Sequence, residues 1–235
     1  MNTNLASKYY GGKDPRQVPA YSFAEASRYL RLPRSTLMSW VRGRNYVYNS
    51  MLSYSEPLIT QGIIAYSFLS FDVLIEAHIL KALRKIHNVS MKSLRAALKT
   101  AQAKFGIRNL LLSPHLKAGA GELFLDRYGD LINLSKSGQY AMKQILIAHL
   151  ERVEYDSDKL PFRFYPFLSD YKEPKKIILI DPLISFGKPV LANKNISTSV
   201  IVSRIDAGEG VEEVAYDYKI DHQDIEDAIL YERAA

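Results

Sequence analysis

Apolar residues recur at three- and four-residue steps on both sides of a proline in residues 21–44, which predicts two short helices joined by a tight turn. Ser22 can cap the first helix, and Pro33 ends it because the residue before a proline avoids the α region. Gly43 is a typical C-terminal stop for the second helix. The apolar positions of the two helices are Phe23, Ala26, Leu30, Leu37, Trp40 and Val41. This pattern predicts a helix-turn-helix.

The other face of the second helix is polar and basic, formed by Arg34, Ser35, Met38, Ser39 and Arg42. A short helix that presents arginine and serine outward suits a DNA major groove. We therefore expect base and phosphate contacts from Arg34, Ser35, Ser39 and Arg42. The alternative is an ordinary α-hairpin with a solvated arginine face.

Around this motif the pattern is weaker. Residues 1–20 contain glycine and proline without periodicity and predict a mobile arm. Tyrosines alternate with small polar residues in 46–55, which indicates a short hairpin or wing. Helical spacing then returns in 71–86, capped by Ser70, and in 91–104, capped by Ser90, so a helical hairpin should follow the wing.

The middle of the chain mixes both periods. Residues 122–135 alternate on either side of Tyr128-Gly129-Asp130, which predicts a β-hairpin. A helix over 139–151, led by Ser137, and a strand over 162–167 should follow. The charged segment 172–176 is the predicted linker.

The C-terminal part predicts a buried strand at 177–180 and three helices at 198–207, 211–218 and 223–231. In the first of these helices the expected inward residues are Val200, Ile201 and Ile205. The spacing again allows a helix-turn-helix, but the outer face is acidic: Glu212, Glu213, Asp217, Asp224 and Asp227. Phosphates would be repelled there, so packing or protein binding is the better interpretation.

Charge is distributed unevenly along the chain. Residues 195–235 carry three cations and ten carboxylates, whereas the whole chain carries +6, which leaves +13 on residues 1–194. Nine lysines and arginines lie between residues 77 and 121 without one acidic residue. Binding of such a cluster to a phosphate backbone is favourable because it releases the counterions of the nucleic acid. We expect Arg44, Arg84 and Lys85 to contact that backbone; the alternative is a solvated basic face.

Composition limits the remaining possibilities. The 235 residues contain no cysteine, no signal-peptide pattern and no apolar run long enough to span a bilayer, so we expect a cytoplasmic protein without membrane contact. The five histidines show no metal-binding spacing, and no phosphate loop or nucleophile elbow is present. We expect no metal site, no cofactor and no enzymatic activity.

Two segments resemble known families. Residues 21–44 joined to 70–104 resemble the DNA-binding part of MerR-like regulators, with a helix-turn-helix, a wing and a helical hairpin. Residues 177–231 resemble the small, uncharacterised domain of VapB-like antitoxins in Asp181-Pro182, in Gly187-Lys188-Pro189-Val190 and in residues 207–215. One departure is Asn193-Lys194-Asn195-Ile196, where the family has a Gly-Thr-Arg-Ile run, so no role is transferred to those positions.

The second resemblance implies an antitoxin that binds and neutralises a PIN-like ribonuclease toxin and autoregulates its operon as a homodimer on operator DNA. The expected fold is mainly α with small β elements, a MerR-like winged helix-turn-helix followed by a C-terminal strand-and-three-helix domain. The expected divisions are a flexible arm (1–20), the DNA-binding domain with its helical hairpin (21–104), a connecting region (105–171) and an antitoxin-type dimerisation domain (177–235).

Two other functions fit the residues. One is a stand-alone MerR-like transcription regulator without a toxin, whose acidic C-terminal domain serves dimerisation alone. The other is an adaptor whose basic face binds RNA or an acidic protein.

Overall fold

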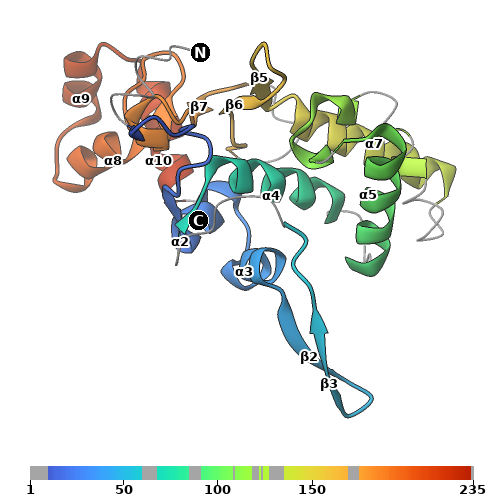
Figure 1. The fold of residues 1–235 in the computed structure, drawn as a ribbon. Coiled ribbons are helices and arrows are strands. Elements are labelled where there is room, and N and C mark those ends of the chain that lie inside the picture. The colour runs from blue at the N-terminus through green and yellow to red at the C-terminus, as the bar shows by residue number, and fades with distance from the viewer. Residues whose placement is uncertain are drawn as a thin grey trace.

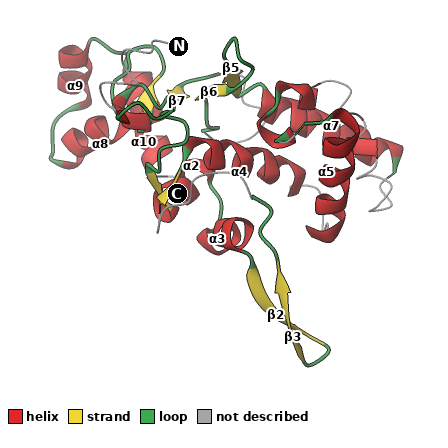
Figure 2. Cartoon of the chain, in the orientation of Figure 1, coloured by secondary structure: helices red, strands yellow, loops and turns green. Residues whose placement is uncertain are grey.

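A computed structural model of the chain describes residues 10–59, 68–84, 91–107, 109–117, 122, 124–126, 135–168 and 175–233. Over these residues the fold is mainly helical with small antiparallel strand pairs, as predicted (Figures 1 and 2). No described helix is both long and apolar enough to cross a membrane. In the same residues no group of three or more histidine, aspartate or glutamate side chains is arranged to hold a metal ion.

Helix α4 (Phe71–Arg84) runs through the middle of the molecule (Figure 1). Nearly all of its residues are buried, because helices α2 (Phe23–Leu30) and α7 (Lys136–Leu150), the 3₁₀ turn η1 (Leu110–Leu112) and strand β6 (Pro161–Phe164) pack around it. A helix covered on several sides is apolar over most of its circumference rather than along one stripe. Ser70 begins it as predicted, with its hydroxyl accepting the Val73 amide at 3.4 Å.

The predicted helix-turn-helix is present as α2 (Phe23–Leu30) and α3 (Arg34–Arg42). Ser22 and Glu25 cap α2 reciprocally: the Glu25 amide donates to Ser22 Oγ at 3.2 Å, and the Ser22 amide donates to the Glu25 carboxylate at 2.9 Å. Arg31 ends α2 in the left-handed conformation. The short strands β1 (Tyr21–Ser22) and β4 (Phe68–Leu69) pair antiparallel and contact α2.

The predicted wing is also present, as strands β2 (Arg44–Tyr48) and β3 (Met51–Ser55). Their two-residue turn has positive φ at both Asn49 and Ser50, which is the signature of a type I′ hairpin. The hairpin extends away from the body of the molecule, below α3 in Figure 1.

The middle region departs from the predictions in three places. Residues 122 and 124–126 are helical, so the β-hairpin predicted there is wrong for them, and residues 127–134 lie outside the described part. Helix α7 (Lys136–Leu150) begins earlier than expected, because Ser135 rather than Ser137 is its cap and accepts the Gly138 amide at 3.2 Å. Two serines two residues apart offer the same local signal. Strand β6 (Pro161–Phe164) ends before residue 167, and it pairs with β5 (Val153–Tyr155).

The other elements of this region are helix α5 and two 3₁₀ turns. They span Met91–Phe105 (α5), Leu110–Leu112 (η1) and Pro114–Lys117 (η2). The predicted caps at Ser90 and linker residues 172–174 lie outside the described residues.

The C-terminal region contains a two-stranded sheet and three helices. Its elements are β7 (Ile178–Leu179), η3 (Ser185–Gly187), β8 (Val190–Leu191), α8 (Thr198–Asp206), α9 (Val211–Tyr218) and α10 (His222–Arg233). The predicted inward position of Val200 is wrong: its side chain is 45% exposed, whereas Ile201 and Val202 are buried. Positions 200 and 202 lie about 200° apart on a helix, so only one of them can face α10.

Both ends of the chain contribute to one continuous buried cluster that runs from Tyr21 to Tyr231. The rings of Tyr29 and Tyr231 stack with centroids 6.4 Å apart, which joins α2 to α10. Beside them Arg28 forms an ion pair with Glu232. The predicted domain boundaries stay a prediction, because the buried cluster of the described residues continues across them.

The described part of the predicted arm is held against the body. The Arg16 side chain is 6% exposed and pairs with Asp14 and Asp156, each at 2.6 Å. Asp156 thus anchors a buried arginine. A single buried charge leaves no periodic signal, which is why this attachment was not expected.

Candidate nucleic-acid interface

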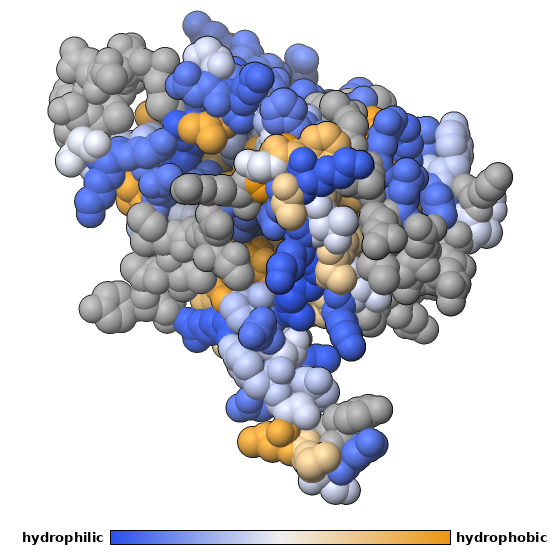
Figure 3. Space-filling view, turned by 45° about the vertical axis from the view of Figure 1, so that its right-hand side comes forward, coloured by the Kyte–Doolittle hydropathy of each residue, from blue (hydrophilic) through white to orange (hydrophobic). Residues whose placement is uncertain are grey.

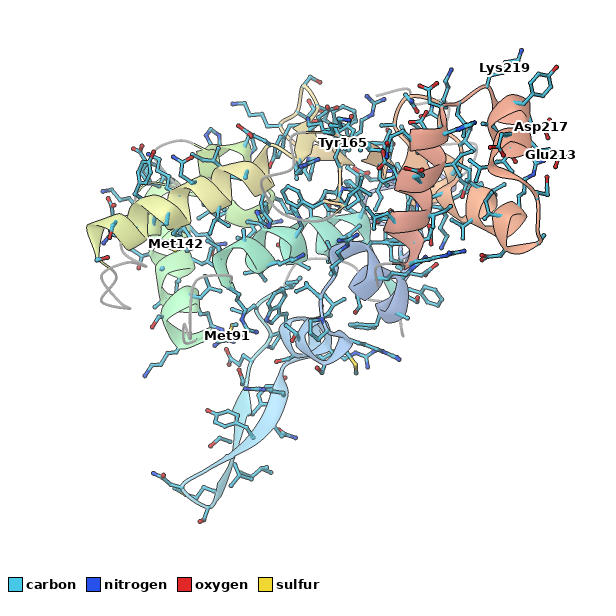
Figure 4. All side chains as sticks on the ribbon, turned by 180° about the vertical axis from the view of Figure 1, so that it is seen from behind. Met91, Met142, Tyr165, Glu213, Asp217 and Lys219 are labelled. Carbon is cyan, nitrogen blue, oxygen red and sulfur yellow. The ribbon has the colours of Figure 1, made fainter. Side chains whose placement is uncertain are left out.

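A polar groove of about 690 Å³ lies where α3, the β2–β3 hairpin, the end of α4 and the start of α5 meet. Figure 4 shows the molecule from behind, with Met91, which lines this groove, on α5 near the top of the hairpin. The lining residues are Ser35, Thr36, Ser39, Trp40, Arg44, Tyr46, Tyr54, Ser55, Glu56, Arg84, Met91, Lys92 and Arg95. Helix α3, which is the predicted recognition helix, the β2–β3 wing and the basic ends of α4 and α5 thus share one concave surface.

Four cations line the groove from three different elements, namely Arg44 on β2, Arg84 on α4 and both Lys92 and Arg95 on α5, and one carboxylate, Glu56, accompanies them. Arg84 lies over the Trp40 ring with its guanidinium carbon 5.7 Å from the centroid. The guanidinium of Arg95 donates to the backbone carbonyl of Glu56, which joins α5 to the segment after the hairpin. The excess of positive charge suits a phosphate backbone.

Helix α3 presents hydroxyl groups to the same groove. Ser35 is exposed and Ser39 is half-buried, and both line it. Leu37, Trp40 and Val41 are buried, as predicted, and Trp40 also borders the groove. Met38 was expected to face outward but is partly buried against the core. The face available to a ligand is therefore narrower than expected and centred on the serines.

Two predicted contacts lie outside the groove. Arg34 is exposed at the start of α3 and borders a shallow hollow with Arg28 and Arg31. The Arg42 guanidinium carbon lies 4.8 Å from the Phe23 ring centroid, so this side chain covers α2. Lys85 lies outside the described residues. Of the seven predicted residues the structure brings together Ser35, Ser39, Arg44 and Arg84.

The contact residues predicted from the sequence do not include Lys92 and Arg95. Both belong to the acid-free stretch that indicated a polyanion, and they stand three residues apart on one helix face. Nothing local shows that this face meets α3, because tertiary packing brings α5 to the groove. The two tyrosines of the hairpin that line the groove were recognised for their alternation and not for this position.

Close backbone packing fixes the hairpin relative to α3. Gly43 has φ +73°, and a Cβ there would lie 2.5 Å from the Ser55 carbonyl oxygen and 2.7 Å from Tyr54 Cζ. The Tyr54 hydroxyl also donates to the Arg42 carbonyl at 2.8 Å. Only glycine accommodates this approach, so the wing emerges from the recognition helix at a defined angle.

The opposite end of the molecule has the opposite charge. Figure 4 shows Glu213 and Asp217 on α9, far from the hairpin. Arg204 of α8 pairs with Asp217 at 2.7 Å and with Glu209, so that end neutralises its own arginine. The basic groove and the acidic helix are separate surfaces.

Buried ionisable groups lie inside the body rather than in the groove. Burial, with a contribution from Asp72, raises the pKa of Glu76 to about 8, and burial raises the pKa of Asp72 to about 6. Burial also holds the pKa of His78 well below its usual value, so this imidazole is neutral at pH 7. None of these groups lines the groove, and they bear on stability rather than on nucleic-acid contact.

Two family descriptions match the chain. Residues 19–98 match a family described as "Putative DNA-binding HTH domain", and residues 178–231 match one described as "Protein of unknown function (DUF433)". The first range contains the recognition helix, the hairpin and the groove cations Arg84, Lys92 and Arg95. The second contains the acidic helix α9.

Similar whole proteins come from Mycobacterium tuberculosis. A protein named "Putative antitoxin VapB45" is 29% identical over 227 residues, covering 90% of this chain and 93% of that protein. "Uncharacterized protein Rv2308" is 24% identical, covering 90% and 89%. The crystal structure of Rv2018 superposes with a TM-score of 0.65 at 23% identity, covering 90% of this chain and 98% of that one. The chain thus has the fold of Rv2018 over nearly its whole length and a segment similar to DNA-binding helix-turn-helix domains.

Proposed function

We propose that this protein is a DNA-binding antitoxin that binds operator DNA, autoregulates its operon and neutralises a PIN-like ribonuclease toxin. The observation that carries the DNA-binding part is the groove, in which four cations from β2, α4 and α5 accompany two serines of α3, the exposed Ser35 and the half-buried Ser39. The antitoxin part is supported by the relative named "Putative antitoxin VapB45". The protein acts by binding rather than by catalysis.

On DNA, Arg44, Arg84, Lys92 and Arg95 contact phosphates, and Ser35 and Ser39 reach base edges in the major groove. Arg34 and Arg42 contact phosphates on either side of the recognition helix. A homodimer places two such helices on a palindrome, with half-sites about 34 Å apart or a multiple of that distance. The C-terminal region, whose exposed face is acidic, is the surface for the toxin, and bound there the antitoxin blocks the nuclease's active site.

The salt dependence of DNA binding tests the groove. The probe is a duplex from directly upstream of the coding sequence, and the variant is Arg84→Ala with Lys92→Ala. The slope of log K against log[salt] is negative, and each lost phosphate contact should make it less negative by about 0.9. The control Lys194→Ala removes an exposed lysine that does not line the groove, and its slope should equal that of the wild type. Equal slopes for all three proteins would refute the interface.

The flanking arginines need a separate test. Arg34→Ala with Arg42→Ala should weaken the gel shift while circular dichroism stays normal. An unchanged shift would remove these two residues from the interface and leave the groove cations in place.

The toxin is tested by co-expression with the neighbouring gene. A tagged copy of this protein should retain the neighbour's product through affinity purification and relieve its toxicity in cells. Failure of both, with DNA binding intact, would refute the antitoxin role and leave a DNA-binding regulator.

A further inference from the structure

The tip of the β2–β3 hairpin is apolar although it stands in solvent. Val47, Met51 and Leu52 are 71%, 68% and 76% exposed, and they adjoin the turn at Asn49-Ser50. Figure 3 shows hydrophobic residues at the end of the projecting hairpin. Single exposed apolar residues are normal on a protein surface, but three large ones at one tip indicate a binding site.

The register of the hairpin places these residues on both of its faces. Val47 lies opposite Leu52 in one cross-strand pair, and Met51 belongs to the next pair, so it points to the other face. A two-residue type I′ turn makes the tip as narrow as a β-ribbon can be. The tip is therefore a thin apolar wedge rather than a flat patch that would suit another protein surface.

Charge indicates a nucleic acid as the partner. No acidic residue occurs between residues 26 and 55, and the hairpin begins at Arg44 on the edge of the basic groove. Gly43 fixes the hairpin to the end of the recognition helix. Because the base of the hairpin is fixed to α3, the tip lies about one hairpin length from whatever α3 binds.

The length of the hairpin fits the spacing of DNA grooves. Five residues per strand extend about 17 Å. One helical turn of DNA is about 34 Å, so a neighbouring minor groove lies roughly 17 Å along the axis from the centre of a major groove. Leucine and methionine are among the side chains that enter base steps from the minor groove and kink the duplex.

We propose that Met51 and Leu52, supported by Val47, form a wedge that enters the minor groove beside the α3 site and bends the DNA. This inference rests on the proposed DNA-binding function. It assigns the hairpin tip to deformation of the duplex, and it assigns phosphate binding to the groove cations.

A circular-permutation assay measures the bend. The probe is the duplex from directly upstream of the coding sequence, permuted about the site that a footprint of the wild-type protein defines. The wild type should bend it by about 20–90°. Met51→Thr with Leu52→Thr keeps strand propensity and should abolish most of the bend. Affinity should fall by less than about ten-fold, because the variant also no longer has to unstack bases.

The matched control is Asn45→Thr, an exposed position at the base of the same hairpin, which should bend DNA like the wild type. The slope of log K against log[salt] should stay unchanged in the tip variant, since no phosphate contact is lost. Should the double variant fail to fold, Val47→Thr on the facing strand tests the same wedge, with folding judged by circular dichroism.

The outcomes separate the two proposals. A wild-type protein that shifts this duplex without bending it, or a tip variant that bends it fully, overturns the wedge and leaves the proposed function intact. A wild-type protein that does not bind the duplex overturns both. A tip variant that keeps its bend but loses a co-purified protein or its oligomeric state assigns the tip to protein docking and overturns the wedge.

Discussion

The guanidinium carbon of Arg84 lies 5.7 Å from the centre of the Trp40 ring, so the last residue of α4 covers the side chain that anchors α3. Trp40 is 2% exposed, and its carbonyl accepts the amides of Leu58 and Ile59 at 2.8 and 3.0 Å. One residue thus connects the recognition helix, the segment after the wing and the basic end of α4.

Trp40→Ala should lower the free energy of unfolding by about 3–5 kcal/mol, because it leaves a cavity under the recognition helix. Urea denaturation followed by circular dichroism measures this. Arg84→Ala removes only the contact over the ring and should cost about 0.5–1 kcal/mol. A Trp40→Ala protein as stable as the wild type would show that the indole does not anchor α3.

Gly43→Ala should destabilise the protein by about 1–3 kcal/mol, since the residue has φ +73° and its Cβ would meet Tyr54 and Ser55. It should also weaken binding to the upstream duplex by displacing the hairpin. Gly106→Ala is the matched control: Gly106 has φ +65° but no atom lies within 4 Å of the added carbon. If both variants lose equal stability and equal affinity, the close approach at Gly43 has no consequence.

Glu76→Gln should change how stability depends on pH. Burial raises the folded-state pKa of Glu76 from 4.5 to about 8, and one oxygen of its carboxyl group has no hydrogen-bond partner. Between these values the unfolded chain releases a proton that the folded chain keeps, so the group's contribution to stability is complete below pH 4.5 and is lost as the pH rises through 8.

The glutamine variant should therefore gain on the wild type as the pH rises, by an order of a few kcal/mol at pH 9 relative to pH 5. Urea midpoints at the two pH values measure the difference. Glu151→Gln, at an exposed position, should follow the wild-type curve. Parallel curves for Glu76→Gln and the wild type would show that Glu76 is not protonated in the folded protein.

Glu232 connects the two ends of the chain, because it pairs with Arg28 and accepts the hydroxyl of the buried Thr198. Glu232→Ala should cost about 1–3 kcal/mol, because it removes the ion pair with Arg28 and leaves the Thr198 hydroxyl only its 3.3 Å hydrogen bond to the Pro189 carbonyl. A double-mutant cycle with Arg28→Met isolates the ion pair. A coupling energy of zero would mean that the pair contributes nothing to joining α2 and α10.

The sequence predicts local structure best where its signals are local. Ser22, Pro33 and Gly43 mark the ends of α2 and α3 by their own conformational preferences, and both helices lie where these residues place them. At residues 122–126 the alternating pattern predicts a strand, but a run so rich in leucine and phenylalanine also suits a buried helical turn, which the structure has for the residues it describes.

The groove depends on contacts that no local pattern contains. Lys92 and Arg95 reach it because the start of α5 borders the same groove as α3, and Arg42 lies outside it because its guanidinium covers Phe23. The acid-free charge pattern predicts a basic surface, but only the packing of helices decides which cations share it.

The stacked pair Tyr29–Tyr231 has a consequence for regulation, if both partners bind as proposed. A ligand on the C-terminal helices that shifts α10 must also perturb α2, and through it the recognition helix, since the contact is part of one core. Linkage then requires reciprocity: whatever factor the toxin imposes on operator affinity, the operator imposes on toxin affinity. A change in the cellular toxin level would then change promoter occupancy, and the same coupling free energy would set both effects.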